Sequence, residues 1–171
     1  MVSNDYIVGL TDGEGCFYIG IRYPKDAHKT VRVEPHFYIK LRGDDLPVLE
    51  EVKQAFGCGA IYYQNEKRQN HSACYRFEVD ALKDIKEKLI PFFEKYPLHS
   101  KKQKDFLIFK KIFGLVDSQI HKTSAGLKEI EKLKVIMNHR TRWMREIRMS
   151  SGVGKVSYPD HRPSEIGGPD M

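Results

Sequence analysis

Hydrophobic and polar residues alternate in four stretches of the chain, which predicts four β-strands. In the first stretch Phe17 and Ile19 share one face. In the second, basic and aromatic residues lie between the apolar ones, although Pro35 falls on the apolar side, where a proline weakens a strand prediction. The four stretches are residues 17–23, 31–42, 60–64 and 73–79. They predict two hairpins whose apolar faces share a core.

Apolar residues spaced three or four positions apart predict four helices between and after these strands. We expect Pro91 to end the second helix, because proline lacks an N–H donor. From Ser150 the chain is rich in Gly, Pro and Ser, so residues 1–149 are predicted to form one domain and residues 150–171 a flexible tail. The helices are expected from Asp45 to Phe56, Asp80 to Ile90, Lys101 to Val116, and Thr123 or Ser124 past Trp143.

Residues 4–15 are predicted to form a further short helix, which differs from an ordinary surface helix in two ways. Gly9 and Gly13 lie four positions apart on one face, and each glycine costs about 1 kcal/mol against alanine. Asp12 and Glu14 lie in the last turn, where the helix dipole disfavours anions. A second helix in close contact with the glycines, and a divalent cation at the helix end, would explain both features.

The composition indicates a folded protein with an anionic partner. The formal net charge is +6, a modest excess that could also merely keep the protein soluble, and charged residues make up 30% of the chain, which suits a folded protein that contacts nucleic acid. Three widely spaced cysteines indicate half-buried reduced thiols and neither a zinc site nor a disulfide framework. No apolar run approaches the length of a membrane span. We therefore expect no membrane association, and a cytoplasmic or organellar-matrix location.

Residues 7–15, with the sequence IVGLTDGEG, resemble the nine-residue signature of the LAGLIDADG homing endonucleases, with Glu as the final acid where Asp is commoner. The order of predicted elements agrees with this resemblance. It implies an α+β fold with the order αββαββα, an antiparallel sheet with helices on one face, and extra C-terminal helices. In this family the sheet forms a saddle whose concave face lies in the DNA major groove.

A weaker copy of the signature lies at residues 113–118, but Gln119 and Ile120 stand where the second acid and the last glycine belong. We interpret it as part of a core helix. A single motif then implies a homodimer, in which two motif helices meet on a two-fold axis. The residues expected at this interface are Ile7, Val8, Gly9, Leu10, Asp12 and Gly13.

The resemblance also assigns catalytic roles. Glu14 matches the family's metal-binding acid and the Gly13 carbonyl a further ligand, for Mg²⁺ with Mn²⁺ or Ca²⁺ as substitutes in binding. Asp12 has no clear role beyond capping or orientation. Lys101 matches the family's late lysine, with Lys102 and Lys104 as alternatives, although lysines at a helix start are usually a solvated face.

The chain departs from the family pattern at Leu41, where well-studied relatives often carry a glutamine. The water-ordering role of that glutamine would pass to Lys40 or Arg42, or remain unfilled. Strand alternation predicts the side chains that face DNA, with Lys67 and Arg68 on a loop, although each could be plain surface. The predicted strand residues are Tyr18, Arg22, Arg32, Glu34, His36, Tyr38, Lys40, Tyr62, Gln64 and Arg76.

These features predict a site-specific endonuclease that cleaves a long, nearly palindromic double-stranded DNA target by divalent-metal-dependent hydrolysis. Two alternatives stay open. An RNA maturase or a non-cleaving DNA-binding protein would keep the basic face but could dispense with the acid, and host intron RNA would be a further partner. A structural dimer with incidental charge would bind nucleic acid weakly and with little dependence on salt.

Overall fold

The computed structural model describes residues 1–24, 30–64 and 73–150, with side chains as far as Met137. The chain divides into two compact units, Met1–Asn138 and His139–Met171. The first unit contains the sheet and its covering helices, and the second contains the end of the last helix. The loop residues Lys67 and Arg68 and the predicted tail beyond Ser150 lie outside the described residues.

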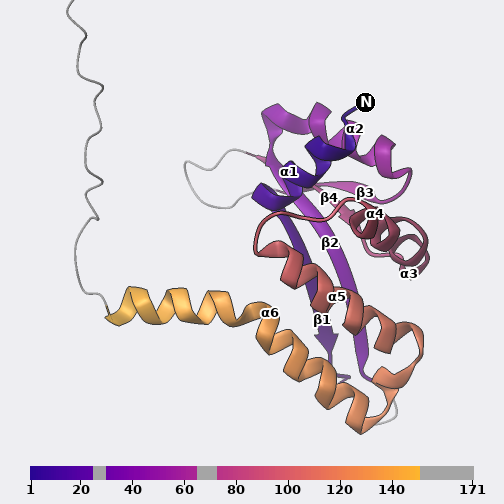
Figure 1. Cartoon of the computed structure of the whole chain (residues 1–171), viewed down its shortest axis with the longest axis vertical. Helices are drawn as coiled ribbons and strands as arrows, with labels where there is room; N and C mark the ends of the chain where they lie inside the picture. Colours follow the sequence, from indigo (N-terminus) through magenta and orange to yellow (C-terminus); the bar gives the residue numbers. More distant parts are fainter. Residues whose placement is uncertain (25–29, 65–72, 151–171) are drawn as a thin grey trace, which may run out of the picture. The chain divides into compact units, whose positions relative to one another are not determined.

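The elements follow the predicted αββαββα order and continue into additional helices (Figure 1). The predicted α+β class is therefore confirmed. In chain order they are α1 (Asn4–Glu14), β1 (Gly15–Arg22), β2 (Arg32–Arg42), η1 (Gly43–Asp45), α2 (Leu46–Phe56), β3 (Ala60–Gln64), β4 (Cys74–Val79), α3 (Leu82–Asp84), the π-helical turn η2 (Ile85–Leu89), α4 (Ile90–Lys95), α5 (Lys102–Asp117), η3 (Ile120–Lys122) and α6 (Ser124–Ser150).

The four strands form one antiparallel sheet in the order β1-β2-β4-β3. β2 lies between β1 and β4, but β4 pairs only with its second half, from Phe37 to Arg42. Pro35 lies in the first half and pairs with Ile19 of β1. This part of β2 has a neighbour in the sheet on one side only, which is where a strand tolerates proline.

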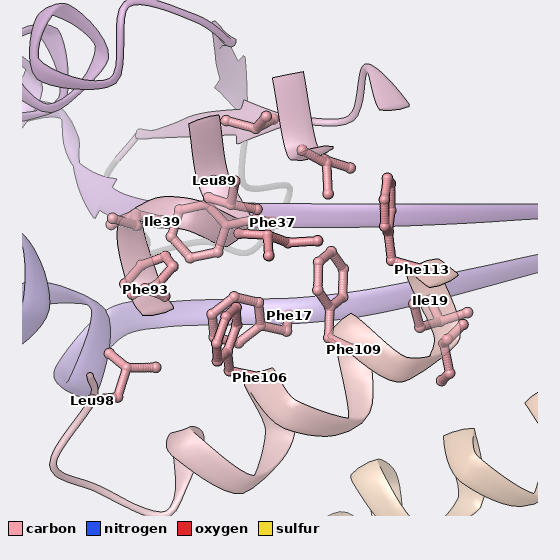
Figure 2. Close-up of a cluster of buried hydrophobic side chains, with 14 of the residues drawn as sticks. Phe17, Ile19, Phe37, Ile39, Leu89, Phe93, Leu98, Phe106, Phe109 and Phe113 are labelled. Atoms are coloured by element: carbon pink, nitrogen blue, oxygen red, sulfur yellow. The ribbon is translucent and has the colours of Figure 1, made fainter. Parts of the chain in front are cut away.

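Phenylalanines from the sheet and the covering helices meet in one core (Figure 2). The ring of Phe17 on β1 lies 5.1 Å from Phe37 on β2 and 5.5 Å from Phe106 on α5. Phe93 of α4 closes the cluster 5.4 Å from Phe37. Aromatic pairs at these distances stabilise a core beyond the area they bury. The helices therefore cover the apolar face of the sheet, and on the polar face Lys134 of α6 lies 5.6 Å from the centre of the Tyr18 ring.

Pro91 does not end the second predicted helix. The helical course continues from Leu82 through η2 into α4, which ends at Lys95. Proline normally clashes with the carbonyl four residues earlier, but the wider turn of a π-helix changes that spacing. The extra turn places Phe93 in the core with no exposed surface. The helix prediction for this segment was therefore too short.

The weaker copy of the signature is the end of α5, as predicted. Phe113 and Val116 are buried in the core there, 4% exposed each. Cys16, Cys58 and Cys74 are half-buried, and burial raises the pKa of the Cys58 thiol. Within the described part of the chain, no helix has the length and hydrophobicity needed to cross a bilayer.

Candidate functional site

The first helix runs into the sheet without a connecting loop. Glu14 is the last residue of α1, and Gly15 is the first residue of β1. A Cβ at Gly15 would lie 2.6 Å from the Thr11 methyl carbon and 2.8 Å from the Thr11 carbonyl oxygen. Only glycine fits this turn, which holds the exposed Glu14 carboxylate at the edge of the sheet.

Asp12 contacts the loop that precedes α5. Its carboxylate accepts hydrogen bonds from the backbone N–H of His99 at 2.9 Å and of Ser100 at 3.1 Å. Burial by itself raises the pKa of Asp12, but the hydrogen bonds from the Ser100 side chain and from both backbone amides outweigh burial and lower it. The charge of Asp12 is therefore compensated inside the chain, and the divalent cation inferred from the sequence is needed only beside Glu14.

Lys102 takes the position that the sequence prediction gave to Lys101. Its Nζ donates hydrogen bonds to the carbonyl oxygens of Thr11 at 2.9 Å and of Gly13 at 2.8 Å. Lys101 is an exposed residue just before α5, and Lys104 is also exposed. Among the described residues, neither side chain forms a hydrogen bond or an ion pair with α1. The structure therefore places the alternative, Lys102, at the motif helix.

Lys40 and Arg42 differ in how close they lie to this helix end. Ile39 pairs with Gly15, so Lys40 is the next residue of β2 beyond the pair that follows Glu14 in the chain. Arg42 lies at the far end of the strand and forms an ion pair with Asp44 at 3.4 Å. Leu41 is half-buried against the core, as its place on the apolar face predicted. Of the two candidates for the glutamine role, Lys40 is the nearer.

The oxygens at the end of α1 suit a hard cation but make an incomplete site. The Glu14 carboxylate and the Gly13 carbonyl are the kind of ligand that Mg²⁺ prefers. Gly13 already accepts a hydrogen bond from a cation, the Lys102 ammonium. In the described residues, no cluster of three or more His, Cys, Asp or Glu side chains could hold a metal. The remaining ligands must come from water, a phosphate or a second motif helix.

One face of α1 is open. A Cβ at Gly9 or at Gly13 would meet no atom within 4 Å, and the neighbouring Tyr6 side chain is 46% exposed. Leu10 is half-buried at the margin of this face. The side chains of Ile7 and Val8, which the sequence predicted at the interface, pack in the chain's own core, 0% and 4% exposed. Tyr6, which the prediction did not include, lies one turn before Gly9 and Leu10.

The strand residues predicted to face DNA share the polar face of the sheet. The register pairs Tyr18 with His36 and Tyr62 with Arg76, and alternation along each strand places the others on the same side. The residues with exposed side chains are Tyr18, Arg22, Arg32 and Tyr62, and those that are partly buried are Glu34, His36, Tyr38, Lys40, Gln64 and Arg76.

Two carboxylates organise the basic residues of this face. Glu34 pairs with Arg22 at 2.7 Å near the end of the β1–β2 hairpin. Glu78, which the sequence prediction did not include, accepts from both His36 and Arg76, each at 2.7 Å.

A hollow of about 350 Å³ lies over the second cluster. Its lining includes Tyr18 and Tyr38. The pKa of Tyr38 is raised, because burial, a hydrogen bond with Cys16 and the charge of Cys16 disfavour the phenolate. The hollow is therefore a polar depression in the sheet face, bordered by neutral rings and paired charges.

Comparison with known proteins places the same elements in one family. Residues 7–113 match the family model of the LAGLIDADG endonucleases. Over 132 residues, 76% of this chain, the sequence is 35% identical to the probable intron-encoded endonuclease 3 of Neurospora crassa. The chain spans 24% of the length of that relative, and 35% and 25% of the lengths of two further curated relatives that it matches.

Two solved structures have the same fold. The homing endonuclease I-TnaI is 34% identical in sequence, with a TM-score of 0.70 over 86% of this chain and 99% of that chain. I-SmaMI bound to uncleaved DNA in the presence of calcium ions is 29% identical, with a TM-score of 0.72 over 81% of this chain and 46% of that chain.

The Asp12 contacts predict a stability that depends on pH. Because the folded-state pKa of Asp12 is lowered, its carboxylate stabilises the fold above the ordinary value of 3.8, and this contribution is lost as the pH falls below that value. Replacing Asp12→Asn leaves one side-chain oxygen for two backbone N–H donors, so it should lower the free energy of unfolding by about 1 kcal/mol or more at neutral pH, the usual contribution of one hydrogen bond. Chemical denaturation of both proteins from pH 3 to pH 8 measures the difference.

Asp44→Asn serves as the control, because the Asp44 side chain is 84% exposed and its ion pair is long. It should change stability little at any pH. A loss for Asp12→Asn that stays constant down to pH 3 would contradict the assigned role of the carboxylate.

Proposed function

This chain belongs to the family of LAGLIDADG endonucleases, and we propose that it is a site-specific endonuclease that cleaves double-stranded DNA by divalent-metal-dependent hydrolysis. The observation that carries the proposal is the hydrogen bond from Lys102 to the Gly13 carbonyl, next in the chain to the exposed Glu14, where α1 meets the sheet. A metal-binding acid and a fixed cation side by side are what phosphodiester hydrolysis requires. The relatives described above are named as endonucleases, which supports the same conclusion.

The polar sheet face is the proposed DNA-binding surface. The B-DNA major groove is about 12 Å wide and admits a β-ribbon. Exposed Arg22 and Arg32 lie near the end of the β1–β2 hairpin, where phosphates would lie, and tyrosines and partly buried polar residues lie further in. This division suits backbone contacts at the margin and base contacts at the centre.

Each residue at the end of α1 then has a separate task. A bound Mg²⁺, held by Glu14 and the Gly13 carbonyl, would activate a water molecule and offset charge on the phosphate. Lys102 supplies a positive charge that its hydrogen bonds to Thr11 and Gly13 hold in place, and this charge stabilises the extra negative charge of the transition state. Asp12 holds the loop from which α5 begins and thereby positions Lys102.

A second motif helix is proposed to lie against Gly9 and Gly13 and to complete the metal site. The open face of α1 supports this, because helix backbones can approach closely only where side chains are absent. We propose that a second copy of this chain provides the helix, so that two half-sites are read by one homodimer. The alternative is a further segment of a longer protein, which the match to 46% of the I-SmaMI chain favours.

A second candidate function is nucleic-acid binding without cleavage, as in an RNA maturase. The basic face alone would serve it. The exposed Glu14 has no hydrogen bond or ion pair within the described residues, so nothing in the fold of this chain requires the acid. Its presence beside Lys102 therefore favours the endonuclease.

Glu14→Gln should abolish cleavage in Mg²⁺ and leave DNA affinity nearly intact. Glutamine keeps the size of the side chain but removes the charge that holds the cation. Cleavage of a selected duplex and its binding without metal are measured in parallel. If the variant cuts at the rate of the unaltered chain, Glu14 is not the metal ligand; if the unaltered chain binds but never cuts, the binding function replaces the endonuclease.

Lys102→Met should lower the cleavage rate by about 10² to 10³, the usual loss for one electrostatic group in an active site. Lys101→Met is the matched control, because it removes the same charge one residue away from an exposed position. It should leave the single-turnover rate nearly unchanged. Equal losses in the two variants would mean that both lysines act through general attraction to DNA.

Gly9→Leu should weaken assembly without harming the folded chain. An added Cβ at Gly9 meets no atom within 4 Å in the isolated chain, and leucine favours a helix by up to about 1 kcal/mol over glycine, but overpacking a helix contact costs about 1–3 kcal/mol. The dissociation constant between two chains should therefore rise about tenfold or more, measured by sedimentation with and without duplex DNA.

Gly114→Leu on α5 is the control for this substitution, because a Cβ there also meets no atom within 4 Å. It should gain the same helix stability and leave assembly unchanged. A single unaltered chain bound to its target, or equal behaviour of the two variants, would refute the proposed contact.

A further inference from the structure

A buried carboxylate lies on the face that is proposed to bind an anionic partner. Glu78 is 6% exposed, and its two oxygens accept from His36 Nδ1 and Arg76 Nη2 at 2.7 Å each. A carboxylate weakens attraction to phosphates, and its burial is costly unless it is fully paired. Its presence therefore indicates a task other than phosphate binding, and the proposed function gives the setting for that task.

Arg76 is held on more than one side. Glu78 binds one terminal nitrogen, and the guanidinium lies 5.3 Å from the centre of the Tyr38 ring. The side chain is 31% exposed and borders the 350 Å³ hollow. Its Nε is shielded from solvent and has no partner among the described residues. An arginine held in this way cannot follow a phosphate backbone freely, but its remaining donors keep a constant position.

Glu78 also determines which His36 nitrogen carries a proton. A carboxylate oxygen can only accept, so His36 Nδ1 must donate to it, and Nε2 is the ring nitrogen left for a ligand. One buried acid thus orders two side chains that line the same hollow. The polar face has a defined donor and acceptor pattern at this point, which is the requirement for reading a base edge.

The Arg22–Glu34 pair lies on the same face but is built differently. The distance is again 2.7 Å, but the arginine side chain is 72% exposed and the glutamate 28%. An exposed pair is weak and exchanges readily with a phosphate. Two ion pairs of the same type and length therefore differ mainly in how firmly the arginine is held.

We infer that Glu78 is a positioning residue for sequence recognition, and that it holds Arg76 so that the guanidinium donates to O6 and N7 of a guanine in each half-site. This inference rests on the proposed DNA-binding function and adds a specific base contact to it. Bidentate pairing of arginine with guanine is the commonest specific contact in the major groove. Without Glu78, Arg76 would be free to turn to a phosphate, and affinity would remain while specificity fell.

The test is selection of bound duplexes from a randomised library in Ca²⁺. The unaltered chain should show a guanine preference at one position of each half-site. Arg76→Lys keeps the charge but loses the planar fork, and Glu78→Gln keeps the side-chain size but loses the charge that holds the fork. Both should reduce the preference at that same position about tenfold or more, the range for one bidentate pair.

Glu94→Gln is the control variant, because Glu94 on α4 pairs with Lys110 of α5 and is not among the residues of the polar sheet face. It changes the net charge by the same amount as Glu78→Gln, so any general gain in affinity should be common to both. It should leave the guanine preference intact. A merely structural role for Glu78 would instead lower the free energy of unfolding and weaken binding to all sequences equally. Arg76→Lys keeps the test decisive if Glu78→Gln does not fold.

Three outcomes would overturn the inference and leave the endonuclease proposal standing. They are an unchanged preference in Arg76→Lys, loss of preference at different positions in the two variants, and an equal weakening at every position. If the unaltered chain enriches no sequence at all, the proposed function fails and the inference fails with it.

Discussion

The end of α1 and the start of α5 compensate each other's charge. Asp12 accepts the backbone N–H groups of His99 and Ser100, and Lys102 donates in return to the carbonyls of Thr11 and Gly13. The last carbonyls of a helix otherwise lack partners, and the helix dipole there attracts the Lys102 charge, while the Asp12 carboxylate supplies acceptors for two amides of the loop before α5. The acid and the lysine therefore hold the two segments together, and everything assigned to the Gly13 carbonyl depends on that exchange.

Most of the fold could be predicted because its hydrophobic periods are undisturbed. The alternation around Phe17 and Phe37 correctly predicted which side chains lie on each face of the sheet. The spacing of Phe106, Phe109 and Phe113 correctly predicted the helix α5. The helix around Pro91 could not be predicted, because a proline normally indicates the end of a helix and no local sequence pattern predicts a π-helical turn. The burial of Ile7 and Val8 also escaped prediction, since α1 is apolar on more than one side.

The candidate site was predicted in part, and its errors have physical causes. Lys102 lies four residues before Phe106 and seven before Phe109, so helical spacing puts it on the inner face of α5 and Lys101 on the outer one. Because Lys101 and Lys104 lie beside Lys102 in the sequence, this helical spacing was overlooked. Glu78 was not predicted, although it lies two residues after Arg76 on the same face of β4. Its role follows only from contacts between strands, which sequence alone does not give.

The direct join between Glu14 and Gly15 ties two periodicities together. One residue added before it would rotate the acid by about 100° around the helix axis, and one added after it would exchange the two faces of β1. Substitutions can therefore alter the base-facing side chains while the spacing from Gly13 to Phe17 stays constant. The number of residues in this segment is therefore more strictly constrained than the identity of their side chains.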